Sequence, residues 1–263
     1  MRGVIVLLLG LAAALAQARD ISGCTPGIES ALRALNPKQP ITGALVSAQC
    51  KGWPPGRGKV LAAVMAFEQA PRPDRRWVGV LALVNTQRLQ LLNSHRFEIA
   101  EESGIGVDDN SLRLDTAPYD LAPGLRALGL RYASSAPGPS AADAGFGDEL
   151  TLFVPEGHTL RPVFGMSMLR TRAVEGCLGK CPHAAWDTAS FTIAIGPPGP
   201  MGWNDLHVTA TVVRNSAAAT AQADATPQRQ RLVYRYTGNA YRQEASPFDW
   251  DDYCCRAGGP AAR

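Results

Sequence analysis

Paired carboxylates are the residues of this chain whose spacing comes closest to acid–base chemistry. They stand side by side at Glu101–Glu102, Asp108–Asp109 and Asp251–Asp252. A glycosidase needs its two carboxyl groups on facing elements about 5 to 10 Å apart, whereas sequence neighbours are typical of a solvated acidic turn. The histidines are scattered, at His95, His158, His183 and His207. None belongs to an HExxH-type pair, so the sequence predicts no catalytic residue.

The segment CLGKCPH, residues 177–183, is the one place where several metal-ligating side chains come close together. Cys177, Cys181 and His183 lie within reach of a single ion, but a structural zinc site takes four ligands and usually a second pair nearby. Gly176 and Gly179 allow the chain to turn between the cysteines. We therefore predict a local Cys177–Cys181 disulfide bond and no metal.

The loop GPPGPMGWND, residues 196–205, presents Trp203, Asn204 and Asp205 just before an alternating apolar run. An exposed tryptophan at a loop tip is typical of a protein-binding anchor. The alternative is a corner that begins a strand, with the tryptophan packed beneath it and an Asn or Asp side chain bonded to the turn. The sequence leaves both interpretations open.

The first residues of the chain have the pattern of a signal peptide. Arg2 precedes an apolar run of about a dozen residues, and small residues follow around position 16. A membrane-spanning helix needs about 20 apolar residues, and no later stretch is apolar enough, so we expect no membrane span. We predict removal of residues 1–18 and a mature periplasmic or secreted protein. Because residues 21–24 resemble a lipobox, an outer-membrane lipid anchor on Cys24 is the alternative.

The composition indicates a folded β-protein without a nucleic-acid partner. The formal net charge is only +3, and the basic residues are spread along the chain. The 20 prolines and 26 glycines are also spread out, which is typical of turns. Residues 27–35 predict one short helix. Apolar runs between turns predict strands at 60–67, 77–84, 125–132, 149–154, 191–195, 206–213 and 231–236.

The strands recur in a similar order, which indicates a repeat. The segment from Ser111 aligns with that from Ser190, and each continues through a Pro/Gly loop into a strand, a small-residue loop and a hairpin. We predict a single all-β domain at 19–263 with units at 41–100, 111–169 and 190–245, and equivalent hairpins at 149–164 and 231–244. Such units are typical of propeller blades; a β-sandwich is the alternative.

The remaining cysteines follow from the predicted ring. In a circular array the first and last strands meet, so Cys24 and Cys50 would come close to Cys254 and Cys255. Adjacent cysteines are strained when bonded to each other. We therefore predict at least one disulfide bond between the two pairs, with a local Cys24–Cys50 bond as the rival.

Four motifs carry a resemblance to a known family: CKGWPP at 50–55, LDTAPYDLAPGLRALGLR at 114–131, GWNDLHV at 202–208 and YRYTGNAYR at 234–242. The chain resembles exported proteobacterial proteins with degenerate FG-GAP (VCBS-type) propeller repeats, some of which inhibit lysozyme-like enzymes or act as immunity proteins. Calcium-binding repeats of that family carry a D-x-D-x-D-G-type loop, and the ion takes about six to eight oxygens. The matching corner here holds only Asn204 and Asp205, so we expect no calcium and no other cofactor.

Together these observations predict a periplasmic protein that binds another protein, such as a lysozyme-like enzyme or a secreted toxin. A rigid sheet would present a loop to the partner. The candidate loops are 133–148, with Phe146, Asp148 and Glu149, and 197–205, with Trp203, Asn204 and Asp205. The competing hypotheses are a hydrolase of envelope polysaccharides or peptides and a carbohydrate-binding or structural envelope module.

Overall fold

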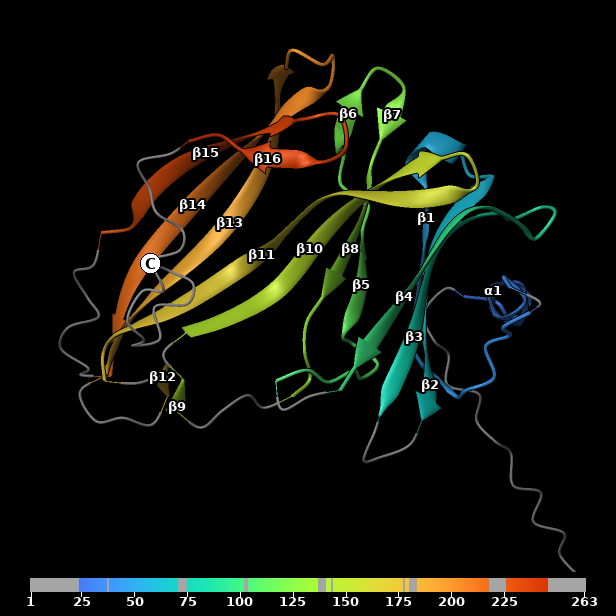
Figure 1. Cartoon of the computed structure of the whole chain (residues 1–263), viewed down its shortest axis with the longest axis horizontal. Coiled ribbons are helices and arrows are strands. Elements are labelled where there is room, and N and C mark those ends of the chain that lie inside the picture. The colour runs from blue at the N-terminus through green and yellow to red at the C-terminus, as the bar shows by residue number, and fades with distance from the viewer. Residues whose placement is uncertain are drawn as a thin grey trace, which may run out of the picture.

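The all-β prediction is confirmed by a computed structural model of the chain (Figure 1). The structure describes residues 24–36, 38–70, 75–101, 104–136, 141–142, 144–176, 178–179, 184–217 and 226–245. Helix α1 (Pro26–Arg33) overlaps the predicted helix at 27–35, and a 3-10 turn follows at Pro54–Gly56. Every other regular element in these residues is a strand.

Four strands near the start of the chain form an antiparallel meander. They are β1 (Leu45–Gly52), β2 (Val60–Ala70), β3 (Arg76–Asn85) and β4 (Gln90–Ala100). Nearly every residue of β3 is buried, because α1 covers one face of the meander and the next strands cover the other (Figure 1). A strand buried on both faces appears as a continuous apolar run, which explains the sequence WVGVLALV.

A second group of strands faces this meander. It consists of β5 (Leu112–Asp115), β8 (Leu128–Tyr132), β10 (Ala144–Glu156) and β11 (Thr159–Glu175), paired in that order. The turn between β10 and β11 places Gly157 at a φ of 58°, a conformation that favours glycine. The predicted hairpin at 149–164 is therefore confirmed, and its strands extend beyond those bounds.

The last group continues the sheet from β11. Its strands are β13 (Ala185–Pro198), β14 (Asn204–Ser216), β15 (Gln228–Tyr236) and β16 (Tyr241–Gln243). The predicted hairpin at 231–244 is present as β15–β16. Two small ribbons stand apart, β6 (Asp120–Ala122) with β7 (Leu125–Arg126), and β9 (Ala141–Ala142) with β12 (Leu178–Gly179).

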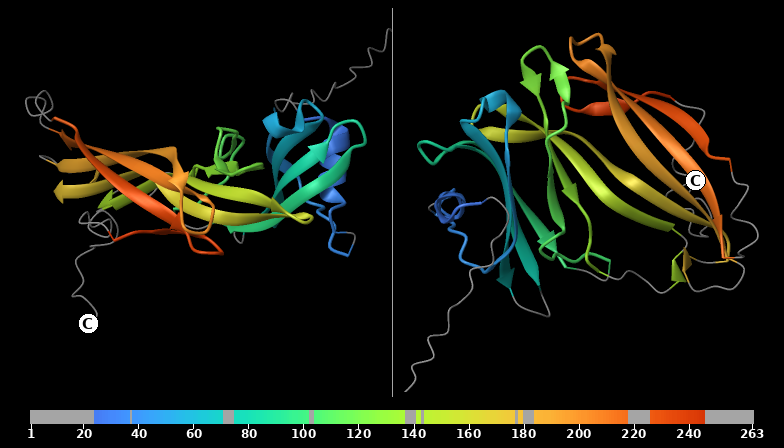
Figure 2. Two further views of the ribbon diagram at one scale, coloured as in Figure 1. Left: turned by 90° about the horizontal axis from the view of Figure 1, so that it is seen from above. Right: turned by 180° about the vertical axis from the view of Figure 1, so that it is seen from behind.

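The sheet does not close into a ring within the described residues. Its path runs β1-β2-β3-β4-β11-β13-β14-β15-β16, and its two end strands are not paired with each other. Figure 2 shows the meander at one end of an elongated molecule and β13–β16 at the other. The closed propeller is therefore not formed, and the structural equivalence of the predicted units stays a prediction.

Three buried apolar clusters hold these groups together. One lies between α1 and the meander, a second between the meander and β5, β8 and β10, and a third between β10–β11 and β13–β16. Strand β10 contributes to two of them, because Leu150, Leu152 and Val154 point to one side and Phe153 to the other. The β5–β8–β10 group is thus an inner layer with two distinct faces.

The predicted disulfide bond between the N-terminal and the C-terminal cysteine pairs is wrong, and the rival bond is present. Cys24 and Cys50 are bonded to each other, with their Cα atoms 5.1 Å apart. The packing of α1 on the meander brings the residue before the helix next to β1, and the absence of ring closure removes the reason for a bond to Cys254 or Cys255. The bond also occupies the sulfur that a lipid anchor on Cys24 would need. Cys177, Cys181, Cys254 and Cys255 lie outside the described residues.

Candidate functional site

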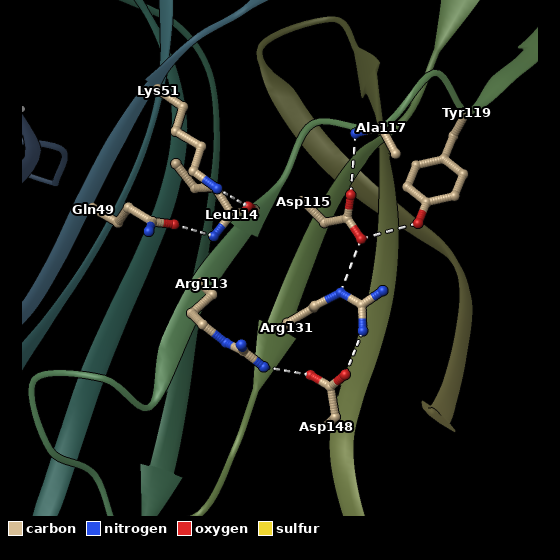
Figure 3. Close-up of polar contacts among 9 residues, drawn as sticks. All are labelled: Gln49, Lys51, Arg113, Leu114, Asp115, Ala117, Tyr119, Arg131 and Asp148. Atoms are coloured by element: carbon tan, nitrogen blue, oxygen red, sulfur yellow. Dashed lines mark hydrogen bonds and ion pairs between the residues drawn. The ribbon is translucent and has the colours of Figure 1, made fainter. Parts of the chain in front are cut away.

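An ionic cluster lies on one face of the inner layer, where β5, β8 and β10 run side by side (Figure 3). Arg131 of β8 is at its centre. Its guanidinium donates to Asp115 of β5 at 2.8 Å and also to Asp148 of β10. Asp148 accepts a second hydrogen bond, from Arg113 at 2.7 Å. Two carboxylates and two guanidiniums therefore alternate across three strands.

The contacts of Asp115 and Tyr119 shift the pKa values of both side chains. Burial raises the pKa of Asp115, but hydrogen bonds from the Ala117 N–H, Arg131 and Tyr119 outweigh it and hold that pKa below 3.8. Burial and the neighbouring Asp115 carboxylate raise the pKa of Tyr119 to about 12. Near neutral pH, Asp115 and Tyr119 thus hold their protonation states, which does not suit them to general acid–base catalysis.

A polar cleft of about 350 Å³ beside the cluster separates β5 from β1. Two side chains of β1 cross it: Gln49 accepts a hydrogen bond from the Leu114 N–H, and Lys51 donates to the Leu114 carbonyl at 2.7 Å (Figure 3). These contacts supply the main-chain partners that a neighbouring strand would otherwise give to β5. Gln49 and Lys51 therefore link the meander to the inner layer, whereas the ionic cluster links β5, β8 and β10 within that layer.

Replacing Asp115 with asparagine is expected to lower the free energy of unfolding by about 2 kcal/mol at neutral pH, because it removes the charge that Arg131 faces. The lowered pKa means that ionised Asp115 stabilises the fold above pH 3.8 and that this stabilisation is lost as the pH falls through the folded-state pKa. Urea unfolding of the wild-type protein and of Asp115→Asn from pH 7 to pH 2.5 measures the difference between their free energies of unfolding. A wild-type advantage that did not shrink in acid would contradict the assignment.

The opposite face of the inner layer borders an apolar groove of about 480 Å³. One wall is β4, which contributes His95, Phe97 and Ile99. The other wall and the floor come from four further strands and from Ile105, an isolated β-bridge residue that follows β4. Their lining residues are Leu112 of β5, Leu130 and Tyr132 of β8, Glu149, Thr151 and Phe153 of β10, and Pro162 of β11. Apolar grooves with a few polar groups are the usual form of a ligand-binding site in proteins.

The groove exists because two neighbouring strands separate. Within the described residues β4 pairs with β11 at a single position, Ser94 with Thr159. Beyond this point β4 continues along β3 while β11 continues along β10 (Figure 1). At the point of separation the His95 ring packs against Phe153, with centroids 4.9 Å apart. From there the apolar face between the meander and the inner layer is open along β4.

Glu149 gives the groove its charge. Its carboxylate accepts a hydrogen bond from the buried Ser167 hydroxyl, and the side chain lies on the same face as Thr151 and Phe153. Burial lowers the pKa of His95 below 6.5, opposed by a hydrogen bond to the Leu160 backbone. His95 is therefore neutral at neutral pH, and none of the side chains that line the groove is cationic.

The residues predicted in the 133–148 loop occupy different places. Positions 144–148 belong to β10 and not to a loop, which corrects the predicted boundary. Asp148 is in the ionic cluster, whereas the adjacent Glu149 points into the groove on the other face of the layer. Phe146 pairs through its main chain with Arg170, and its side chain lies outside the described residues.

The Trp203 corner lies far from the groove, at the β13–β14 turn. The Trp203 ring is partly buried and stacks on Tyr236, with centroids 3.8 Å apart and planes 5° from parallel. The Asn204 amide donates to the Asp120 carbonyl, and buried Asp205 pairs with Arg235 at 3.3 Å. Of the two interpretations of this corner, the structure shows the packed one.

Most of the groove was not identified from the sequence. Thr151 belongs to a predicted strand, and Phe97 and Ile99 lie in the predicted unit 41–100, but neither their type nor their spacing distinguishes them from core residues. The available signal was the polar content of RFEI at 96–99, which is typical of an edge strand. Glu149 is the one groove residue that the sequence predicts as a partner-binding residue.

Comparisons with known proteins found no matching family model, no matching curated protein and no matching solved structure. The resemblance to FG-GAP-type repeats therefore rests on the sequence motifs alone. No helix in the described ranges is long and apolar enough to cross a membrane. In the same ranges no three His, Cys, Asp or Glu side chains gather as a metal-binding group.

Proposed function

We propose that this protein is a periplasmic binding protein whose groove between β4 and β10 receives an apolar segment of another protein. The observation that carries the proposal is the groove itself: an open cavity of about 480 Å³ in the apolar interface between two layers, with the acidic side chain of Glu149 on its lining. A lysozyme-like enzyme or a secreted toxin, as the sequence motifs imply, is the proposed class of partner.

The chemistry of the lining supports a protein segment over the competing ligands. Phe97, Ile99 and Phe153 offer apolar surface, and burial of such surface is the main source of affinity at protein interfaces. A polysaccharide would need more hydrogen-bonding side chains than Tyr132, Thr151 and Glu149 provide. The ionic cluster on the other face offers no matched acid and base, so hydrolysis has no geometric support among the described residues.

The charge of the groove indicates which charge the partner segment carries. Glu149 is a partly exposed carboxylate at an apolar site, and a charged group in such a place favours a cation on the ligand. His95 stays neutral and does not compete for it. The expected partner segment therefore combines two or more apolar side chains with one lysine or arginine.

Selection of peptides from a random 12-residue phage library against the purified protein tests this proposal. Clones that also bind an unrelated control protein are removed by counter-selection. We expect the remaining peptides to share apolar residues and a basic residue, and Glu149→Gln to weaken them by about tenfold. Failure to enrich any groove-dependent peptide, or enrichment of acidic ones, would contradict the proposed function.

A further inference from the structure

Among the residues that the structure describes, the edge of β4 that faces the groove pairs with another strand only at Ser94. The Ser94 N–H donates to the His158 carbonyl, away from β3, whereas the Glu101 N–H donates to the Arg75 carbonyl, toward the β3 side. The register with β3 is regular between these residues. Because main-chain groups alternate in direction along an antiparallel strand, Arg96, Glu98 and Ala100 direct their N–H and C=O groups outward, and His95, Phe97 and Ile99 direct theirs to β3.

The groove lining supports this assignment independently. Glu98 and Ala100 border the groove together with Phe97 and Ile99. Side chains alternate between the two faces of a strand, and those of Phe97 and Ile99 occupy the groove face, so those of Glu98 and Ala100 belong to the other face. Glu98 and Ala100 therefore reach the groove through their main chain, at the outward edge.

From these two observations, and resting on the proposed function, we infer that the partner segment binds as an additional strand along residues 96–100 of β4. Its main chain pairs with the N–H and C=O groups of Arg96, Glu98 and Ala100, and alternate side chains enter the groove beside Phe97 and Ile99. Strand addition at an exposed sheet edge supplies affinity through the main chain and specificity through side-chain pockets.

The partner is an extended segment of another protein with a basic side chain, because the groove between β4 and β10 carries the Glu149 carboxylate. A segment of three to five residues suffices to span the edge, at about 3.3 Å per residue. Its side chains point alternately into the groove and to solvent. The basic residue is placed on the groove side, within reach of Glu149.

Amide hydrogen exchange by NMR tests the inference, with the tightest phage-selected peptide, synthesised, as the probe. In the free protein the amides of Arg96, Glu98 and Ala100 are expected to exchange at least about tenfold faster than those of Phe97 and Ile99. Saturating peptide is expected to slow the three outward amides by about tenfold or more. N-methylation of alternate peptide residues is expected to reduce affinity by about tenfold, and N-methylation of the intervening residues is not.

Each other outcome overturns strand addition in a distinct way. A peptide that binds at Glu149 without protecting the outward amides leaves the proposed function intact and removes the strand pairing. Outward amides protected in the free protein at every concentration would show that a segment of this chain occupies the edge. Protection that grows with protein concentration would identify a second copy. Failure of any peptide to bind removes the proposed function and the inference together.

Discussion

A tryptophan at Thr151 is expected to weaken a groove-binding peptide by about 100-fold or more while leaving the melting temperature within a few degrees of wild type. Thr151 points into the groove from β10, beside Gly165, whose missing side chain leaves room for a larger neighbour. The indole would occupy the space that the ligand's apolar side chains need, and loss of one such anchor costs about 2 to 4 kcal/mol at an interface. Isothermal titration and differential scanning calorimetry measure both effects.

Thr209→Trp is the matched control for this prediction. Thr209 is a partly buried strand threonine of β14 with its side chain on the face opposite the buried Val208 and Ala210. The same substitution there changes bulk and aromaticity without reaching the groove. Equal affinity of the wild-type protein and Thr151→Trp for the peptide would show that the ligand binds elsewhere.

Removal of the Cys24–Cys50 bond is expected to lower the free energy of unfolding by about 3.5 kcal/mol. The two cysteines are 26 residues apart in the sequence, and closing a loop of this length restricts the unfolded chain by about that amount in the chain-entropy model. The bond also ties α1 to β1, where Ile28 and Leu32 are buried against the meander. Urea unfolding of a Cys24→Ala/Cys50→Ala double variant measures the loss.

The response of the double variant to a reducing agent distinguishes the contribution of the Cys24–Cys50 bond to stability from that of any other disulfide bond. A further loss of stability on reduction would report bonds among the remaining cysteines. Unchanged stability of the double variant relative to the oxidised wild-type protein would contradict the predicted contribution. A helix α1 that became protease-sensitive in the double variant would support the tie between α1 and β1.

Local structure was predictable from the sequence because each signal is local. The run WVGVLALV predicts β3, and Gly157 and Gly238 mark hairpin turns that each require a positive φ. Loop boundaries were less predictable: Asp148 adopts a φ of 54°, unusual for a residue other than glycine, yet lies within β10. The sequence around it, rich in small residues, has the composition of a loop.

Long-range geometry was not predictable by the same means. The ring closure that suggested a bond from Cys24 to the C-terminal cysteines depends on how the first and last strands meet, which no local pattern encodes. The groove depends on a single pairing, Ser94 with Thr159, after which β4 and β11 separate. A similar alternation of side chains on β4 would have produced a closed core if these strands had stayed together.

Methyl NMR of the protein with labelled isoleucine and leucine, titrated with a phage-selected peptide, tests whether the partner segment binds in the groove between β4 and β10. We expect the methyl signals of Ile99, Leu112 and Leu130, which line the groove, to shift and saturate together. The methyls of Leu206 and Leu232, in the cluster that packs against Trp203, are expected to stay in place. Shifts confined to Leu206 and Leu232, with the groove methyls unmoved, would place the binding site at the Trp203 corner and rule out binding in the groove.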